Sequence, residues 1–364
     1  NYLSILVESA MKENENEVIS YLLNGVEDCI KDHGKTLTQD EVNSLFYKLF
    51  DIFDKIEKNR IELNKEEDIK LDLVQKKSSE PKDEEIDDYY DEEIELDNIK
   101  QNIEGAEEII TAFSDAIGAL FKTHKEFCMD IAKKMVEDVL PKYFGNSASI
   151  FEKKMGLFIM DDMIEFLGQE LLGRIWPDII KILVQYVDNP SCEIRQAASY
   201  GLGEFIKHTN QDYSNYKNDI LNIIYKGLEL KKGEEEEDEF HSAQDNIVTA
   251  LGKLIEFRRS EYPNIKEIIT KWIDNLPITG DLAESAGQHN FLCEILVKQP
   301  DIVLGDNNKN VPQIIRIFCK VVNTKYSNDD VDKKIKIIFE EMKKNEAIVS
   351  LVPEAKKKDR KSVV

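Results

Sequence analysis

The stretch that decides the fold is NPSCEIRQAASYGLGEFI, residues 189–206. Apolar or small side chains recur in it every three or four residues, from Ile194 through Ala198 and Leu202 to Ile206. This spacing places them on one face of an α-helix. Residues 176–187 carry the same pattern, and Asp188, Asn189 and Pro190 supply a turn between the two runs. The stretch therefore predicts a helical hairpin.

The same unit recurs along the chain, with second helices centred near residues 110, 158, 199, 249, 289 and 336. That spacing of roughly 40–50 residues is typical of HEAT repeats, and no strand-rich region competes with it. We therefore predict an all-α fold, an α-solenoid of HEAT repeats in which about six helical hairpins stack into a superhelix. A capping box at Thr38–Glu41 is expected at the start of one helix. Residues 1–12 are expected to be the last part of a helix whose partner helix is missing. The hairpins are expected at 126–140 with 148–167, 174–187 with 191–208, 215–229 with 241–258, 263–274 with 280–298, and 312–322 with 328–344.

Residues 1–364 are expected to form a single array, as a fragment of a longer chain. Two acidic runs should be loops, at residues 78–97 and 231–239. Either run could be a solubilising loop or a docking site for Lys- and Arg-rich partners, and charge alone does not separate these readings. Residues 353–364 form a basic tail, which is either a nuclear-targeting patch or a solvated chain end.

The net charge of −24 makes nucleic acid and anionic membranes poor partners and basic proteins good ones. No run approaches the roughly 20 apolar residues of a membrane span. The five cysteines are widely separated in the sequence, which predicts reduced, intracellular thiols.

Motifs for catalysis or cofactor binding are absent from the sequence. Gly201 and Gly203 lack the third glycine of a nucleotide loop, and the five histidines show no zinc-binding spacing. Residues 306–310 resemble a calcium loop but lack its central glycine, so a polar loop between repeats is expected. We predict no catalytic, cofactor-binding or metal-binding residue and no enzymatic activity.

Several polar residues are candidates for partner binding instead. Asp161 and Asp162, followed by Glu165, could form an acidic surface on one helix rather than a catalytic carboxylate pair. The second acidic run contributes Glu234, Glu235, Glu236, Glu237 and Asp238. Arg195 is expected to link neighbouring repeats, with direct partner contact as the alternative.

Residues 174–208 closely resemble the C-terminal repeats of importin-β (karyopherin-β) nuclear transport receptors. The resemblance rests on EIRQAASYGLG at 193–203 and FIMDDMIEF at 158–166. It continues in order through Trp272, Leu276-Pro277, residues 291–293 and residues 303–308. The acidic run at 83–97 also lies where the importin beta-three-like branch tends to carry one, which is a further resemblance. The resemblance implies second helices that line an inner surface, where Gln196, Tyr200 and Glu204 join Asp161 and Asp162 as candidates.

The family resemblance implies a monomeric nuclear import receptor that shuttles between cytoplasm and nucleus. Its implied partners are basic cargo proteins, phenylalanine-glycine nucleoporins and the Ran GTPase, which such receptors contact mainly through N-terminal repeats that this chain lacks. The alternative is a HEAT-repeat scaffold of another complex, such as a phosphatase or kinase assembly.

Overall fold

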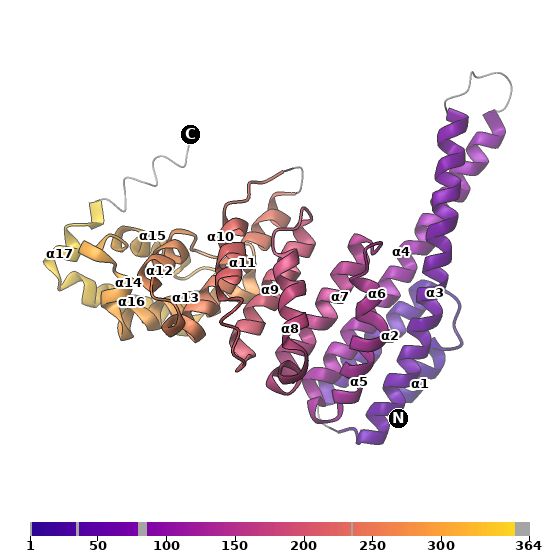
Figure 1. Ribbon diagram of the computed structural model, residues 1–364, viewed down its shortest axis with the longest axis horizontal. Helices are drawn as coiled ribbons and strands as arrows, with labels where there is room; N and C mark the ends of the chain where they lie inside the picture. The colour runs from indigo at the N-terminus through magenta and orange to yellow at the C-terminus, as the bar shows by residue number, and fades with distance from the viewer. Residues whose placement is uncertain (1, 34–35, 79–85, 234–235, 354–364) are drawn as a thin grey trace. The chain divides into compact units, whose positions relative to one another are not determined.

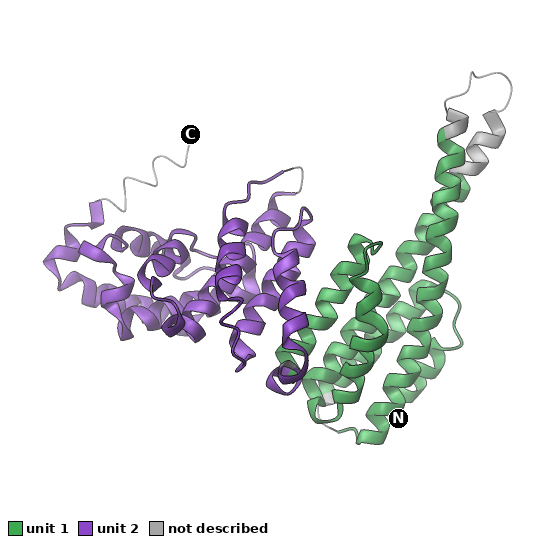
Figure 2. Ribbon diagram, viewed as in Figure 1, with its two compact units in different colours: residues 1–167 green, residues 168–364 purple. Residues whose placement is uncertain are grey.

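The computed structural model describes residues 2–33, 36–78, 86–233 and 236–353. The chain divides into two compact units, residues 1–167 and residues 168–364 (Figure 2). Each unit is a stack of helical hairpins, and the described residues contain helices and turns but no strand. The predicted all-α, HEAT-repeat fold class is therefore confirmed. That the two units continue one array stays a prediction.

The first unit consists of three hairpins in which α4 is the central helix. It packs against α2, α3 and α7, while α1 packs against α2 and α3. Residues 1–12 were expected to lack a partner helix, and this prediction is wrong because α1 pairs with α2. The helices are α1 (Tyr2–Ala10), α2 (Asn16–His33), α3 (Gln39–Ser78), α4 (Ile86–Thr123), η1 (Lys125–Phe127), α5 (Met129–Lys134), η2 (Met135–Val139), α6 (Leu140–Tyr143), α7 (Ile150–Asp162) and η3 (Met163–Leu167).

Helices α3 and α4 form a hairpin much longer than its neighbours, and its far half extends beyond the other helices of the unit (Figure 1). The predicted capping box opens α3: the backbone N–H of Thr38 donates to Glu41 at 2.8 Å, and that of Glu41 donates to the Thr38 hydroxyl at 3.4 Å. Near the base of the hairpin, the rings of Phe53 and Phe113 stack with centroids 4.6 Å apart. Aromatic packing of this kind anchors the two helices in the core.

The first acidic run is not a loop throughout, because α4 begins at Ile86. Residues 86–97 are helical and 78 ends α3, while residues 79–85 lie outside the described residues. Leu96 is buried, which shows that apolar contacts support this part of the helix. The run also contains several glutamates, which are good helix formers despite their charge.

The second unit stacks four hairpins, and its second helices α9, α11, α13 and α16 pack one against the next. With the three hairpins of the first unit, the described residues form seven hairpins rather than about six. The helices are α8 (Gly168–Tyr186), α9 (Cys192–His208), α10 (Lys217–Leu228), α11 (Glu237–Arg258), η4 (Arg259–Glu261), α12 (Ile265–Asp274), α13 (Leu282–Lys298), α14 (Pro300–Val303), η5 (Asp306–Asn308), α15 (Val311–Val321), α16 (Asp329–Lys343) and α17 (Glu346–Val349).

The hairpin that opened the sequence analysis is α8–α9. Arg195 is buried, and its Nη1 donates to the carbonyl oxygens of Asn189 and Pro190, both at 2.8 Å. These bonds hold the turn of its own hairpin, which is a structural role. The expected link between neighbouring repeats stays a prediction.

The second acidic run was expected to be a loop throughout, but it is helical from Glu237, where α11 begins. Three acidic residues therefore occupy the first helical turn, where the partial positive charge of the helix N-terminus favours them. Glu234 and Glu235 lie outside the described residues, as does the basic tail from residue 354 onward.

Candidate partner-binding surfaces

Asp161 and Asp162 end α7 in the first unit, but they do not form an open acidic surface. Asp161 is only 4% exposed, so the expectation that it faces a partner is wrong. The helix packs on α4. Asp162 is half-buried, and its carboxylate lies against the backbone of Gly118 in α4.

Asp162 has unusual electrostatics for a surface carboxylate. Burial and the negative charges of Glu165 and Asp115 raise its pKa to about 7, against the opposing effect of Lys122 and Lys31. The charged form is thus costly in this position. Asp162 stays a candidate contact for a cationic partner, whose charge would favour ionisation.

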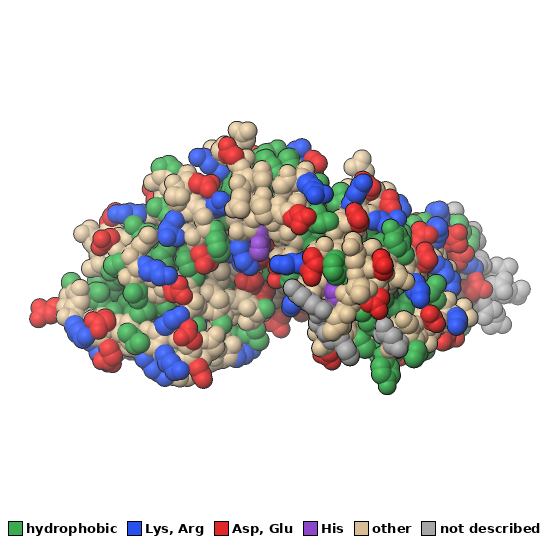
Figure 3. Space-filling model, turned by 90° about the horizontal axis from the view of Figure 1, so that it is seen from below, with side chains coloured by type: hydrophobic (Ala, Val, Ile, Leu, Met, Phe, Trp, Pro, Cys, Tyr) green, Lys and Arg blue, Asp and Glu red, His purple; other side chains and the backbone are tan. Residues whose placement is uncertain are grey.

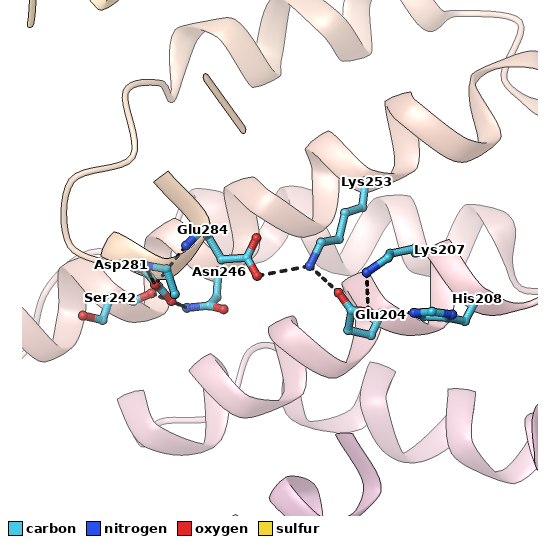
Figure 4. Close-up of polar contacts among 9 residues, drawn as sticks. Glu204, Lys207, His208, Ser242, Asn246, Lys253, Asp281 and Glu284 are labelled. Atoms are coloured by element: carbon cyan, nitrogen blue, oxygen red, sulfur yellow. Dashed lines mark hydrogen bonds and ion pairs between the residues drawn. The ribbon is translucent and has the colours of Figure 1, made fainter. Parts of the chain in front are cut away.

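The three candidates on α9 follow one another along the helix and face α11. Tyr200 and Gln196 are half-buried, whereas Glu204 is only 2% exposed. Figure 4 shows Glu204 in contact with two lysines, Lys253 and Lys207, and with His208. Its carboxylate accepts hydrogen bonds from Lys253 at 2.7 Å, Lys207 at 3.0 Å and His208 at 3.1 Å. The prediction that Glu204 is available to basic cargo is therefore wrong.

The pKa of Glu204 shows how strongly these contacts stabilise its charge. Burial alone would raise this pKa, but the bond from His208 and the charge of Lys253 outweigh it and lower the pKa to about 2. Burial likewise opposes the charge of Lys253, and the paired carboxylates raise its pKa above the ordinary value. Removing one partner from such a buried pair leaves an uncompensated charge.

Lys253 extends the network from α9 to α13, because its Nζ also contacts Glu284 at 3.3 Å (Figure 4). The ammonium lies 5.1 Å from the centre of the Tyr200 ring, a cation–π contact. We call Glu204, Lys253 and Glu284 the second-helix ladder, since each residue comes from a successive second helix. Because Lys253 contacts both glutamates, the ladder joins three successive repeats.

A second set of contacts fixes the turn before α13. Asp245 of α11 accepts from the backbone N–H groups of Thr279 at 2.8 Å and Asp281 at 3.0 Å. Asn246 donates to Asp281 at 2.8 Å, and Asp281 caps α13 through the N–H of Ala283 at 2.9 Å. One repeat thereby positions the first turn of the next.

The remaining candidates lie at the start of α11. Glu236, Glu237 and Asp238 are exposed. Glu237 lies 3.3 Å from the imidazole Nε2 of His241, at helical i,i+4 spacing. On the face drawn in Figure 3, Lys and Arg side chains lie among Asp and Glu, so the net negative charge does not form one continuous patch on that face. We call Glu236, Glu237 and Asp238 the acidic turn. It is accessible, and no contact links it to the other candidate residues among those described.

Sequence reasoning missed a buried cluster centred on Arg60 of α3. The guanidinium is 1% exposed and bonds to Glu57 at 2.8 Å and Glu152 of α7 at 2.5 Å, with Glu107 of α4 at 3.8 Å. Burial lowers the pKa of Arg60, but the paired glutamates outweigh it and hold the pKa above its ordinary value. The only signal in the sequence was an arginine within the apolar stripe of α3.

Features that would suggest other site classes are absent from the described part of the chain. No three His, Cys, Asp or Glu residues there come together as metal ligands. Among the helices described, none has the length and apolar content to cross a membrane. His289 is fully buried, accepts from the N–H of Ile278 at 3.2 Å and lies 2.9 Å from the Tyr326 carbonyl oxygen, so it supports the fold.

Comparison with known proteins finds similarity to importins. The chain is 24% identical over 260 residues to a probable importin-5 homolog of Dictyostelium discoideum, a match that covers 69% of this chain and 24% of the relative. It is 23% identical over 155 residues to importin subunit beta-3 of Saccharomyces cerevisiae, covering 42% of this chain and 14% of the relative. No protein-family model matches. The chain is thus similar to importins over up to 69% of its length.

Solved structures of Kap121p have a fold similar to that of this chain. Kap121p bound to the SUMO protease Ulp1p matches with a TM-score of 0.64 and 16% identity, over 99% of this chain and 30% of Kap121p. Kap121p bound to RanGTP also gives a TM-score of 0.64, with 15% identity over 92% of this chain and 27% of Kap121p. The chain thus spans about a quarter of its first curated relative and under a third of these structures. These relatives are transport receptors rather than enzymes.

Proposed function

We propose that this chain is the cargo-binding and nucleoporin-binding part of a nuclear import receptor, and that it corresponds to the C-terminal repeats of such receptors. The observation that carries the proposal is its relation to importins along 69% of its length. Structures of Kap121p include complexes with Pho4p, with the nucleoporin Nup53p and with RanGTP. By analogy, this chain binds basic cargo and nucleoporins in a RanGTP-regulated cycle and shuttles between cytoplasm and nucleus.

The electrostatics of the chain support basic cargo as the partner class. The net charge is −24, and exposed carboxylates remain after the buried ion pairs are accounted for. Opposite charge accelerates association and excludes acidic competitors. The chain is proposed to act as a monomeric carrier and not as an enzyme.

Binding to a fluorescent basic import-signal peptide, measured with the whole chain, tests the cargo assignment. We expect saturable binding that weakens as salt is raised, because screening acts on exposed charges beyond about 8 Å at physiological ionic strength. Absence of binding at every salt concentration would contradict the assignment.

Retention on immobilised phenylalanine-glycine repeats separates an import receptor from a HEAT-repeat scaffold of a phosphatase or kinase assembly. An importin should be retained, and the same resin carrying serine in place of phenylalanine should release it. A scaffold should pass through both resins.

A further inference from the structure

The first unit has a polar groove on its described surface. None of the residues that line it belongs to the second-helix ladder or to the acidic first turn of α11. It lies along α4, with α2 as one wall and Phe151 and Lys154 of α7 at the other, and its volume is about 1210 Å³. Its residues on α4 run from Asn98 to Asp115 at helical spacing, so they form one stripe of that helix. We call this the α2–α4 groove.

The length of the groove suits an extended chain. Seventeen helical steps from residue 98 to residue 115 span about 26 Å at 1.5 Å per residue. An extended peptide rises about 3.3 Å per residue, so about eight residues would fill that length. The groove is far too long for a single ion or a small molecule.

Two kinds of side chain line the groove, and each suits a different part of a peptide. Carboxylates outnumber cations there, with Lys154 as the single basic residue among those that line it. Glu104, Glu108 and Asp115 are exposed and have no ion-pair partner within 4 Å among the described residues. Such carboxylates can bind ammonium or guanidinium groups.

Amide side chains provide the second kind of contact. Asn14, Asn24, Asn98 and Asn102 are exposed along the groove, and each can both donate to and accept from a peptide main chain. Tyr21 is 67% exposed at the wall formed by α2, where its ring could contact the aliphatic part of a lysine or its charge. A polyamine would satisfy the carboxylates but leave the amides without main-chain partners.

The groove carries negative charge that the protein only partly compensates. Burial raises the pKa of Glu107, against the lowering effect of Arg60 and Lys154. Partial removal from water also raises the pKa of Asp115, and Glu27 adds to the effect. A bound cation would relieve this repulsion, which is a gain in binding free energy that an uncharged peptide could not obtain.

We propose that the α2–α4 groove binds an extended, lysine-rich peptide segment, with carboxylates holding the basic side chains and asparagines holding the main chain. The inference rests on the proposed function, because it names one place where basic cargo binds. It also moves that place away from the acidic residues that the sequence favoured, which are buried, paired or on α11.

Fluorescence anisotropy with the whole chain tests the proposal. The probe is a labelled twelve-residue peptide in which lysine alternates with serine, and its counterpart has glutamine at each lysine. The double variant Glu104→Lys/Glu108→Lys should lower affinity for the lysine peptide about tenfold or more, because two attractive contacts become repulsive. The matched control Glu236→Lys/Asp238→Lys makes the same change of net charge on α11 and should lower affinity less than about threefold.

A charge-neutral variant tests the role of the amides. Asn98→Ala/Asn102→Ala should weaken the lysine peptide about threefold while leaving the slope of affinity against salt unchanged, because hydrogen bonds and not ion pairs are lost. Circular dichroism and thermal unfolding of each variant establish that it is folded.

The outcomes distinguish failure of the proposed function from failure of the groove assignment alone. If the wild-type chain binds neither the lysine peptide nor basic cargo, both the proposed function and the groove assignment are wrong. If the wild-type chain binds but the two charge-reversal variants lose affinity equally, or the α11 variant loses more, the groove assignment alone is overturned. If the Glu104→Lys/Glu108→Lys variant keeps full affinity for the lysine peptide, the groove assignment is likewise overturned.

Discussion

At the scale of single residues, burial decides which charges of this chain can meet a partner. Glu204 and Asp162 are both carboxylates on second helices, yet their pKa values shift in opposite directions. Glu204 is bonded to Lys253 and Lys207, whereas Asp162 is close to the negative charges of Glu165 and Asp115. The neighbours, which come from other helices, set the difference.

The Glu204–Lys253 pair should contribute measurably to stability. Glu204→Gln leaves Lys253 buried with only Glu284 beside it, so we expect the free energy of unfolding to fall by about 2 kcal/mol. Chemical unfolding followed by circular dichroism measures this change. The double variant Glu204→Gln/Lys253→Met removes the orphaned charge and should recover part of the loss; a double variant that is less stable than the single one would contradict this account.

Asp162 should make stability depend on pH in the opposite sense to an ordinary ion-paired carboxylate. Its pKa is raised from 3.8 to about 7 in the fold, so the folded chain holds a proton that the unfolded chain releases. Stability from this group is therefore complete below pH 3.8 and falls as pH rises to about 7. Asp162→Asn should remove that dependence.

The thermal midpoint of Asp162→Asn and of the wild-type chain, measured from pH 4 to pH 8, provides the readout. We expect the variant to be the more stable at pH 8, by about 1–2 kcal/mol. Parallel curves for the two proteins across that range would show that Asp162 ionises normally.

At the scale of elements, close helix packing depends on glycines whose role the sequence does not reveal. A Cβ on Gly252 of α11 would lie 1.9 Å from the side-chain oxygen of Gln288 and 2.9 Å from the indole nitrogen of Trp272. Both of those side chains are buried. The glycine therefore allows α11, α12 and α13 to approach.

Gly252→Ala should destabilise the chain by about 2 kcal/mol, because the added methyl group overpacks the core. Gly287→Ala on α13 is a matched control, since no atom lies within 4 Å of the Cβ it would add. That control should be neutral or stabilise the helix by up to about 1 kcal/mol. Thermal unfolding of both variants tests the prediction, and equal effects would argue against close packing at residue 252.

The elements themselves were largely predictable, for local reasons. The helices of the second unit begin and end within a few residues of the predicted bounds, except that α8 starts at Gly168 and not at residue 174. Pro177 lies inside α8. The acidic run after Ile86 was predicted to be a loop because of its many charged residues. It is helical, and its apolar residues include the buried Leu96.

At the scale of the whole molecule, the strongly negative charge should control binding. Affinity for a basic cargo should fall about tenfold between 50 mM and 200 mM salt, since exposed carboxylates make the contacts. Titrations at four salt concentrations measure the slope. A slope near zero would indicate that cargo binds through apolar contacts instead.

The sequence by itself determined that the chain is a series of helical hairpins, and its motifs carried the resemblance to importins. The hairpins follow from apolar spacing, turn residues and capping, which act over a few residues at a time. Only the tertiary structure decided which polar residues are available. Lys253, which neutralises Glu204, is 49 residues away in the sequence, and the α2–α4 groove combines residues from three helices. Exposure depends on such distant neighbours, so no local pattern could separate a buried ion pair from a docking surface.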